Sequence, residues 1–121
     1  MVGWLRNPSF SAHPRMNNLH SFDTYVVLSI TIKDPVRYRQ YMEGVKPLIL
    51  AAGGKYLCRG GETRVYEGAF EPQRVVLFEW PSLAAHEAFL NSDAYQPLKA
   101  IRLESADTIM FAVAGVETPI A

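Results

Sequence analysis

The sequence predicts an α+β fold in which strands and helices follow one another as β-α-β-β-α-β. Three observations support this order. Residues 25–32, 74–80 and 107–116 are rich in β-branched and aromatic side chains, as strands are. Residues 35–52 repeat apolar side chains at helical spacing. The 121 residues suffice for one domain with a single core. This order is the ferredoxin-like arrangement, which has an antiparallel sheet.

The first half of the chain predicts a strand and then a helix. Tyr25 to Ile32 forms the strand, Asp34 caps the helix, and Pro35 suits its first position. Gly53-Gly54 ends the helix, and Pro47 predicts a kink inside it. The predicted buried stripe of this helix is Tyr38, Tyr41, Met42, Val45, Ile49 and Ala52.

The middle of the chain predicts two strands and a second helix. Lys55 to Arg59 is one strand, with Tyr56 and Cys58 on one side and Leu57 and Arg59 on the other. Thr63 to Glu67 is expected to continue it beyond Gly60-Gly61. Arg74 to Trp80 is the next strand, and Ser82 caps the helix over residues 83–90.

The last part of the chain predicts one more strand. Ser92 or Asp93 is expected to cap a short helical turn around Tyr95, with Pro97 limiting its length. Asp107 to Val116 then forms the fourth strand.

One face of the predicted sheet carries the helices, and the other is too apolar for water. The strands over 74–80 and 107–116 have apolar side chains on both faces. A solvated antiparallel sheet normally alternates apolar and polar residues, and a large exposed apolar patch marks an interaction surface. We therefore expect two sheets to pack face to face in a homodimer.

The composition of the chain indicates which partners and which cellular compartment to expect. Twelve basic residues balance twelve acidic ones, which disfavours nucleic acid as a partner. No stretch approaches the length of a membrane helix. The single cysteine, Cys58, excludes an internal disulfide and is compatible with the cytoplasm.

The expected domain organisation has one folded unit. Residues 1–23 have no steady period and predict a flexible N-terminal tail, residues 24–116 the barrel domain, and residues 117–121 a C-terminal tail. Met16 is an alternative start. His13 and His20 lack further ligands at defined spacing, so no metal site is predicted.

Several motifs occur in an order that resembles a known family. They are Asp34-Pro35, Gly53-Gly54-Lys55-Tyr56, Arg59-Gly60-Gly61, Glu79-Trp80-Pro81-Ser82 and Ser92-Asp93-Ala94-Tyr95. Between Thr24 and Val116 the chain resembles the uncharacterised domain-of-unknown-function family thirteen-thirty of the dimeric α+β barrel superfamily. The long leading segment and Trp80, where phenylalanine is more usual, depart from its pattern. The resemblance implies a two-sheet barrel dimer with one pocket per subunit. It implies no activity.

Arg59, Glu79 and His86 are the candidate catalytic residues. Arg59 and Glu79 lie in apolar strands, where a carboxylate could act as a base and a guanidinium could hold an anionic oxygen. A structural ion pair is the alternative. His86 lies on the second helix as a general base, a haem ligand or a packing residue.

Four aromatic residues are the candidate substrate contacts: Tyr41, Tyr56, Trp80 and Tyr95. Cys58 is interpreted as inert filling. The chain has no phosphate-binding loop, dinucleotide fingerprint or paired-histidine metal motif, so no cofactor is predicted.

The sequence therefore favours a cytoplasmic homodimer that binds a small, partly apolar organic molecule in a cleft lined by Tyr41, Arg59, Glu79 and His86. Relatives in the superfamily make cofactor-independent isomerisation or oxygenation the favoured chemistry. A non-catalytic stress-response or dimerisation module and a haem protein remain the alternatives.

Overall fold

The structure is a computed structural model that describes residues 23–116. Its elements are β1 (Thr24–Ile32), α1 (Pro35–Ala52), β2 (Lys55–Arg59), β3 (Arg74–Trp80), α2 (Leu83–Leu90), α3 (Gln96–Ser105) and β4 (Ala106–Ala114). The predicted tails, together with Met16, His13 and His20, lie outside the described residues, apart from Asp23.

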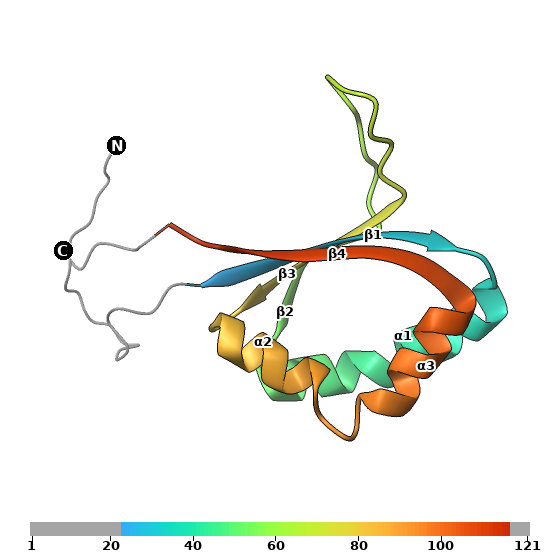
Figure 1. The fold of residues 1–121 in the computed structure, drawn as a ribbon. Coiled ribbons are helices and arrows are strands. Elements are labelled where there is room, and N and C mark those ends of the chain that lie inside the picture. The colour runs from blue at the N-terminus through green and yellow to red at the C-terminus, as the bar shows by residue number, and fades with distance from the viewer. Residues whose placement is uncertain (1–22, 117–121) are drawn as a thin grey trace.

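The four strands form one sheet in the order β2-β3-β1-β4. Every neighbouring pair is antiparallel. The helices all lie on one side of this sheet (Figure 1). The α+β, ferredoxin-like prediction is therefore confirmed.

The core lies between the helices and the inner face of the sheet. Alternate residues of β1 and β3 point into it, because successive side chains of a strand face opposite sides. Helix α1 adds the stripe expected from its spacing, except that Ala52 is exposed. The buried hydrophobic side chains from these three elements are Val26, Leu28, Ile30, Val76, Phe78, Trp80, Tyr38, Tyr41, Val45 and Ile49.

The predicted helix ends are confirmed. The Asp34 carboxylate accepts a hydrogen bond from the backbone N–H of Arg37 at 3.1 Å. Gly53, at φ 103°, donates backbone bonds to α1 carbonyls as its C-cap. The Ser82 hydroxyl accepts from the N–H of Ala85 at 3.0 Å. Helix α1 continues without interruption through Pro47.

The chain between α2 and β4 was predicted wrongly. In place of a short turn it holds the ten-residue helix α3. Pro97 lies in the first turn of α3 rather than limiting it, a position where its missing N–H has no helical partner to lose. The absence of a side chain at Gly44 leaves room for Leu98, which packs α3 against α1.

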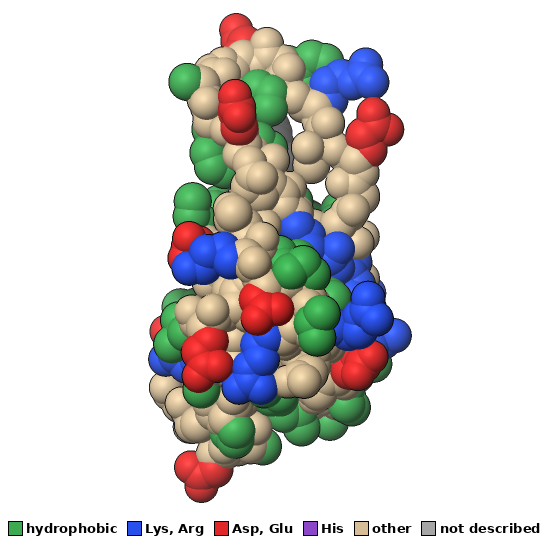
Figure 2. Space-filling view, turned by 90° about the vertical axis from the view of Figure 1, so that its right-hand side faces the viewer, with side chains coloured by type: hydrophobic (Ala, Val, Ile, Leu, Met, Phe, Trp, Pro, Cys, Tyr) green, Lys and Arg blue, Asp and Glu red, His purple; other side chains and the backbone are tan. Residues whose placement is uncertain are grey.

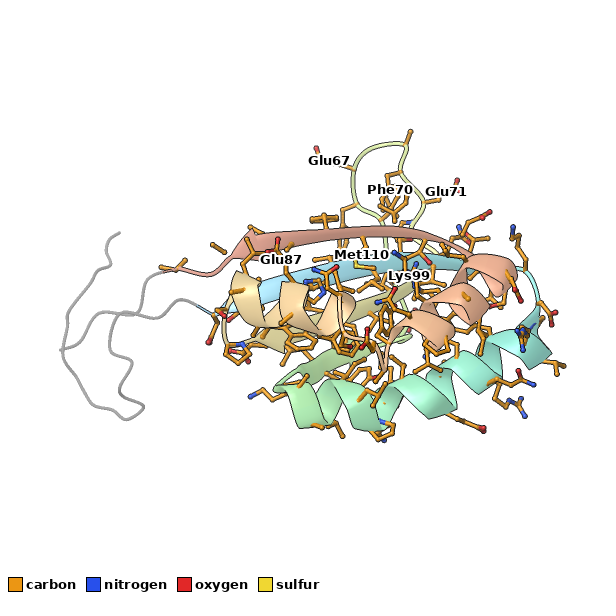
Figure 3. The ribbon with its side chains drawn as sticks, turned by 60° about the horizontal axis from the view of Figure 1, so that its bottom comes forward. Glu67, Phe70, Glu71, Glu87, Lys99 and Met110 are labelled. Atoms are coloured by element: carbon orange, nitrogen blue, oxygen red, sulfur yellow. The ribbon has the colours of Figure 1, made fainter. Side chains whose placement is uncertain are left out.

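The expected strand over residues 63–67 was also wrong. Residues 60–73 form a loop without regular structure, which we call the β2–β3 loop. The loop leaves the sheet on the side opposite the helices (Figure 1) and forms the upper part of the molecule in Figure 2. Phe70 lies near its far end between Glu67 and Glu71 (Figure 3).

Candidate functional site

A cavity lies between the inner face of the sheet and the helices. It has a volume of about 50 Å³, counted as the space open to the centre of a water-sized sphere. One water needs roughly 10–15 Å³ on this measure, so the cavity has room for a small organic group. Most of its lining is apolar or aromatic, and its charged side chains are those of Arg59 and Arg74.

Six of the seven candidate residues come together in this cavity. They are Tyr41, Tyr56, Arg59, Trp80, His86 and Tyr95. Five of them belong to four different elements and Tyr95 is the N-cap of α3, so only the tertiary fold brings them together.

Glu79 does not join them, and the expectation that it shares a cleft with Arg59 is wrong. It pairs with Tyr25 and Lys55 on the outer face of the sheet. Its Oε1 lies 3.5 Å from Nζ of Lys55. A hydrogen bond with the side chain of Asp23, together with the charge of Lys55, lowers the pKa of Glu79 despite partial burial. The carboxylate is therefore stabilised in its charged form. This favours a structural role for Glu79, as a partner of Lys55, over a role as a catalytic base.

Arg59 reaches the cavity because β2 contains a register shift. Tyr56 is opposite Phe78 and Cys58 is opposite Leu77, so Leu57 is the extra residue of a bulge. After the bulge Arg59 is opposite Val76, a residue of the inner face. The predicted grouping of Arg59 with Leu57, away from Tyr56, is therefore wrong, and Cys58 lies exposed on the outer side.

A hydrogen-bonded group closes one side of the cavity. The hydroxyls of Tyr41 and Tyr95 lie 3.0 Å apart. Nε of the buried Arg102 donates to the Tyr95 hydroxyl at 3.2 Å. Burial, followed by the neighbouring Tyr95, raises the pKa of Tyr41, so its phenol stays protonated. Sequence reasoning missed Arg102, because the helix that carries it was expected to be a short turn.

Aromatic rings form the deep wall. Trp80 is 1% exposed, and its ring centroid lies 5.2 Å from that of His86 and 5.3 Å from that of Phe89. Nε1 of Trp80 is buried and has no hydrogen-bond partner among the described residues. A buried donor of this kind is uncommon and marks a position where an acceptor would bind favourably.

His86 presents a neutral imidazole to the cavity. Burial lowers its pKa, and the charge of Glu87 opposes this only in part. Its ring makes no hydrogen bond with another described side chain. A neutral, partly desolvated imidazole can accept a proton from a bound molecule.

The described residues contain no group of three or more metal-ligating side chains. None of the helices within residues 23–116 is both long and apolar enough to span a membrane.

Solved structures with the same fold share little sequence with this chain. A protein of unknown function from Rhodopseudomonas palustris is 16% identical with a TM-score of 0.67, over 79% of this chain and 84% of that one. SnoaB, a cofactor-independent oxygenase from Streptomyces nogalater, is 13% identical with a TM-score of 0.56, over 81% and 96%. A dimeric ferredoxin-like protein of unknown function from Thermobifida fusca is 12% identical with a TM-score of 0.51, over 77% and 91%.

No curated protein matches the chain in sequence. The profile of the domain of unknown function DUF1330 matches residues 23–116, which is most of the chain. This chain therefore belongs to the DUF1330 family.

Proposed function

We propose that this protein binds a small, partly apolar organic molecule in the cavity between the sheet and the helices. The observation that supports this most is the composition of the lining. Aromatic and aliphatic side chains surround a space that a few donors, from Arg59, Arg74 and Trp80, also reach. Such a mostly apolar pocket with a few placed polar groups is typical of small-molecule sites.

Binding of benzyl alcohol, measured by calorimetry, tests this proposal. Met110 lines the cavity from β4, whereas Leu103 is exposed on α3. We expect Met110→Trp to fill the space and to weaken binding about tenfold or more, because the pocket can no longer bury the ring. Leu103→Trp is the matched control and should bind as the parent does. Equal binding by both variants, each with a cooperative unfolding transition, would contradict the proposal.

The chemistry that this site supports best is cofactor-independent proton abstraction by His86, as a first step of isomerisation or oxygenation. The imidazole is neutral and lines the same cavity as the proposed ligand. The cofactor-independent oxygenase SnoaB shares the fold. Exchange of the α-protons of phenylacetone in D₂O, followed by NMR, tests the role. We expect the protein to accelerate exchange and His86→Gln to abolish the acceleration; equal rates with both proteins would rule it out.

We also propose that two copies associate through the outer face of the sheet. Leu77, Val27 and Phe111 stand side by side there on three neighbouring strands. On β4, Ile109 is 57% exposed and Phe111 56%. The Thermobifida fusca neighbour is itself described as dimeric, which supports the proposal.

The β2–β3 loop projects on the same side as this apolar face (Figure 1). Tyr66 is 87% exposed and Phe70 59% exposed on it. Two packed sheets lie roughly 10 Å apart, so a projecting loop would run beside the second copy. Contact with that copy would cover both rings. A cytoplasmic location remains a proposal as well, supported by the single exposed Cys58.

A further inference from the structure

The charged side chains at the cavity are arginines without carboxylate partners. Arg59 and Arg74 line it, and neither forms an ion pair with any described residue. The ion-paired cations within residues 23–116 are Lys33, Arg37, Lys55 and Arg64, and none of them lines the cavity. Arg74 is half-buried and Arg59 is exposed to solvent. Positive charge that no carboxylate neutralises favours binding of an anion, most of all where it is partly desolvated, as at Arg74.

Arg59 is held in place by a stack of rings. Its Cζ lies 4.6 Å from the ring centroid of Tyr56. The Tyr56 ring in turn lies 4.7 Å from that of Phe78, a core residue. A guanidinium that stacks on an aromatic face keeps its N–H groups free at its edge, where they can bind an oxyanion.

Arg74 is held against the backbone of Gly60. A Cβ atom at Gly60 would lie 2.8 Å from Cζ of Arg74 and would also contact Nη1, so the glycine lets the guanidinium lie directly against the backbone. Nε of Arg74 is buried and has no hydrogen-bond partner among the described residues. A buried N–H without an acceptor is unfavourable unless a ligand supplies one.

The two guanidiniums lie at the same side of the cavity. Burial raises the pKa of Tyr56, and the charges of Arg59 and then Arg74 oppose that rise. Arg59 stacks on the Tyr56 ring and Arg74 lies against Gly60, the residue after Arg59, so both positive groups lie at the side of the cavity formed by β2 and β3. Trp80 and Phe89 form the apolar wall farther inside.

We propose that the ligand is an organic anion, with a carboxylate or phosphate group bound by Arg59 and Arg74 and an apolar body against Trp80 and Phe89. This inference rests on the proposed small-molecule function and specifies its substrate class. The planar N–H groups of arginine match the paired oxygens of such an anion.

Calorimetry with three single-ring probes tests the inference. Benzoate and phenyl phosphate carry an oxyanion, whereas benzyl alcohol is neutral and of similar size. At low salt we expect one of the anions to bind about tenfold or more tightly than benzyl alcohol, because charge-assisted hydrogen bonds are stronger than neutral ones. Whichever anion binds more tightly identifies the recognised group. The preference should shrink as sodium chloride is added.

Variants separate charge recognition from pocket shape. Arg59→Gln and Arg74→Gln should each reduce the preference for the anion about tenfold while leaving benzyl alcohol binding unchanged. Arg64→Gln is the matched control, since Arg64 lies in the β2–β3 loop beside Glu62, and it should leave all affinities unchanged. Circular dichroism and unfolding curves establish that each variant is folded.

Four results would overturn the inference. If the anions and benzyl alcohol bind the parent equally, the arginines do not recognise the ligand, although the proposed cavity function stands. The same holds if the preference persists in a folded variant that carries both Arg59→Gln and Arg74→Gln. If the arginine variants lose benzyl alcohol as well, the two side chains only maintain the shape of the pocket. If no probe binds, the proposed function and this inference both fail.

Discussion

One extra residue in β2 decides which side chains meet in the cavity. The bulge at Leu57 moves Arg59 to the inner face, where it stacks on Tyr56. Strict alternation would have placed it outside. Glu79 obeys alternation and stays on the outer face beside Lys55. The sequence could identify both residues as unusual charges in apolar strands, but not their faces, because a bulge leaves no clear signal in residue type.

At the residue scale, the buried imidazole of His86 predicts a pH dependence of stability. Burial lowers its pKa, so below about pH 6.5 the unfolded chain gains a proton that the folded chain resists. The stability due to this residue is therefore complete above about pH 6.5 and is lost as the pH falls through the lower pKa of the folded state.

Urea unfolding at about pH 7.5 and about pH 5.5 measures this loss. Glu79, whose pKa is also lowered, protonates only at more acidic pH and does not contribute in this interval. We expect the parent to lose more stability between the two values than His86→Gln does. Equal losses would show that His86 titrates as it does in an unfolded chain.

At the scale of elements, the sequence predicted those whose ends carry strong local signals. Asp34-Pro35, Gly53 and Ser82 bound helices α1 and α2 as expected. Helix α3 was missed because its N-cap, Tyr95, makes no capping bond through its side chain, and Pro97 was taken as a breaker. Helix α3 is stabilised by a tertiary contact, in which Leu98 packs over Gly44 of α1. That contact joins distant parts of the chain and is invisible to local patterns.

At the junction of α1 with β2, the addition of one methyl group at Gly54 should lower the stability of the fold. A Cβ at the buried Gly54 would lie 2.7 Å from Cγ2 of Ile49 and 2.8 Å from Cζ2 of Trp80. Gly54→Ala should therefore lower the free energy of unfolding by about 1–3 kcal/mol, as overpacking of a core does. Gly61→Ala is the control, because its Cβ would meet nothing within 4 Å. Denaturant unfolding of the two variants compares them, and equal stabilities would contradict the packing at this junction.

At the scale of the whole molecule, the apolar outer face predicts association. We expect the parent to sediment at twice the 13.6 kDa of one chain. Phe111→Asp should shift it to the monomer, because a charge would replace a ring worth about 1.5–3 kcal/mol on burial. Leu103→Asp, on α3 and similarly exposed, should leave the mass unchanged. Analytical ultracentrifugation decides the matter, and a parent that sediments as a single chain would refute the dimer.

The fold and the residues of the pocket could be read largely from the sequence, whereas its reaction could not. Tyr41, Tyr56, Trp80 and His86 lie together because periodicity places them on the inner face or on helices that cover it, Tyr95 caps α3, and Arg59 joins them only through the bulge. The same fold accommodates many chemistries, so fold alone does not assign one. The haem alternative stays a prediction that haem titration would test.

Ligand-induced shifts of methyl NMR signals test the central claim, that the cavity of each subunit is the binding site. Leu28, Ile30 and Met110 line the cavity, whereas Ile109 lies on the outer face of the same sheet. On addition of benzyl alcohol we predict that the methyl signals of the first three move and that those of Ile109 do not. Shifts confined to Ile109, or no shifts at all at saturating benzyl alcohol, would contradict it.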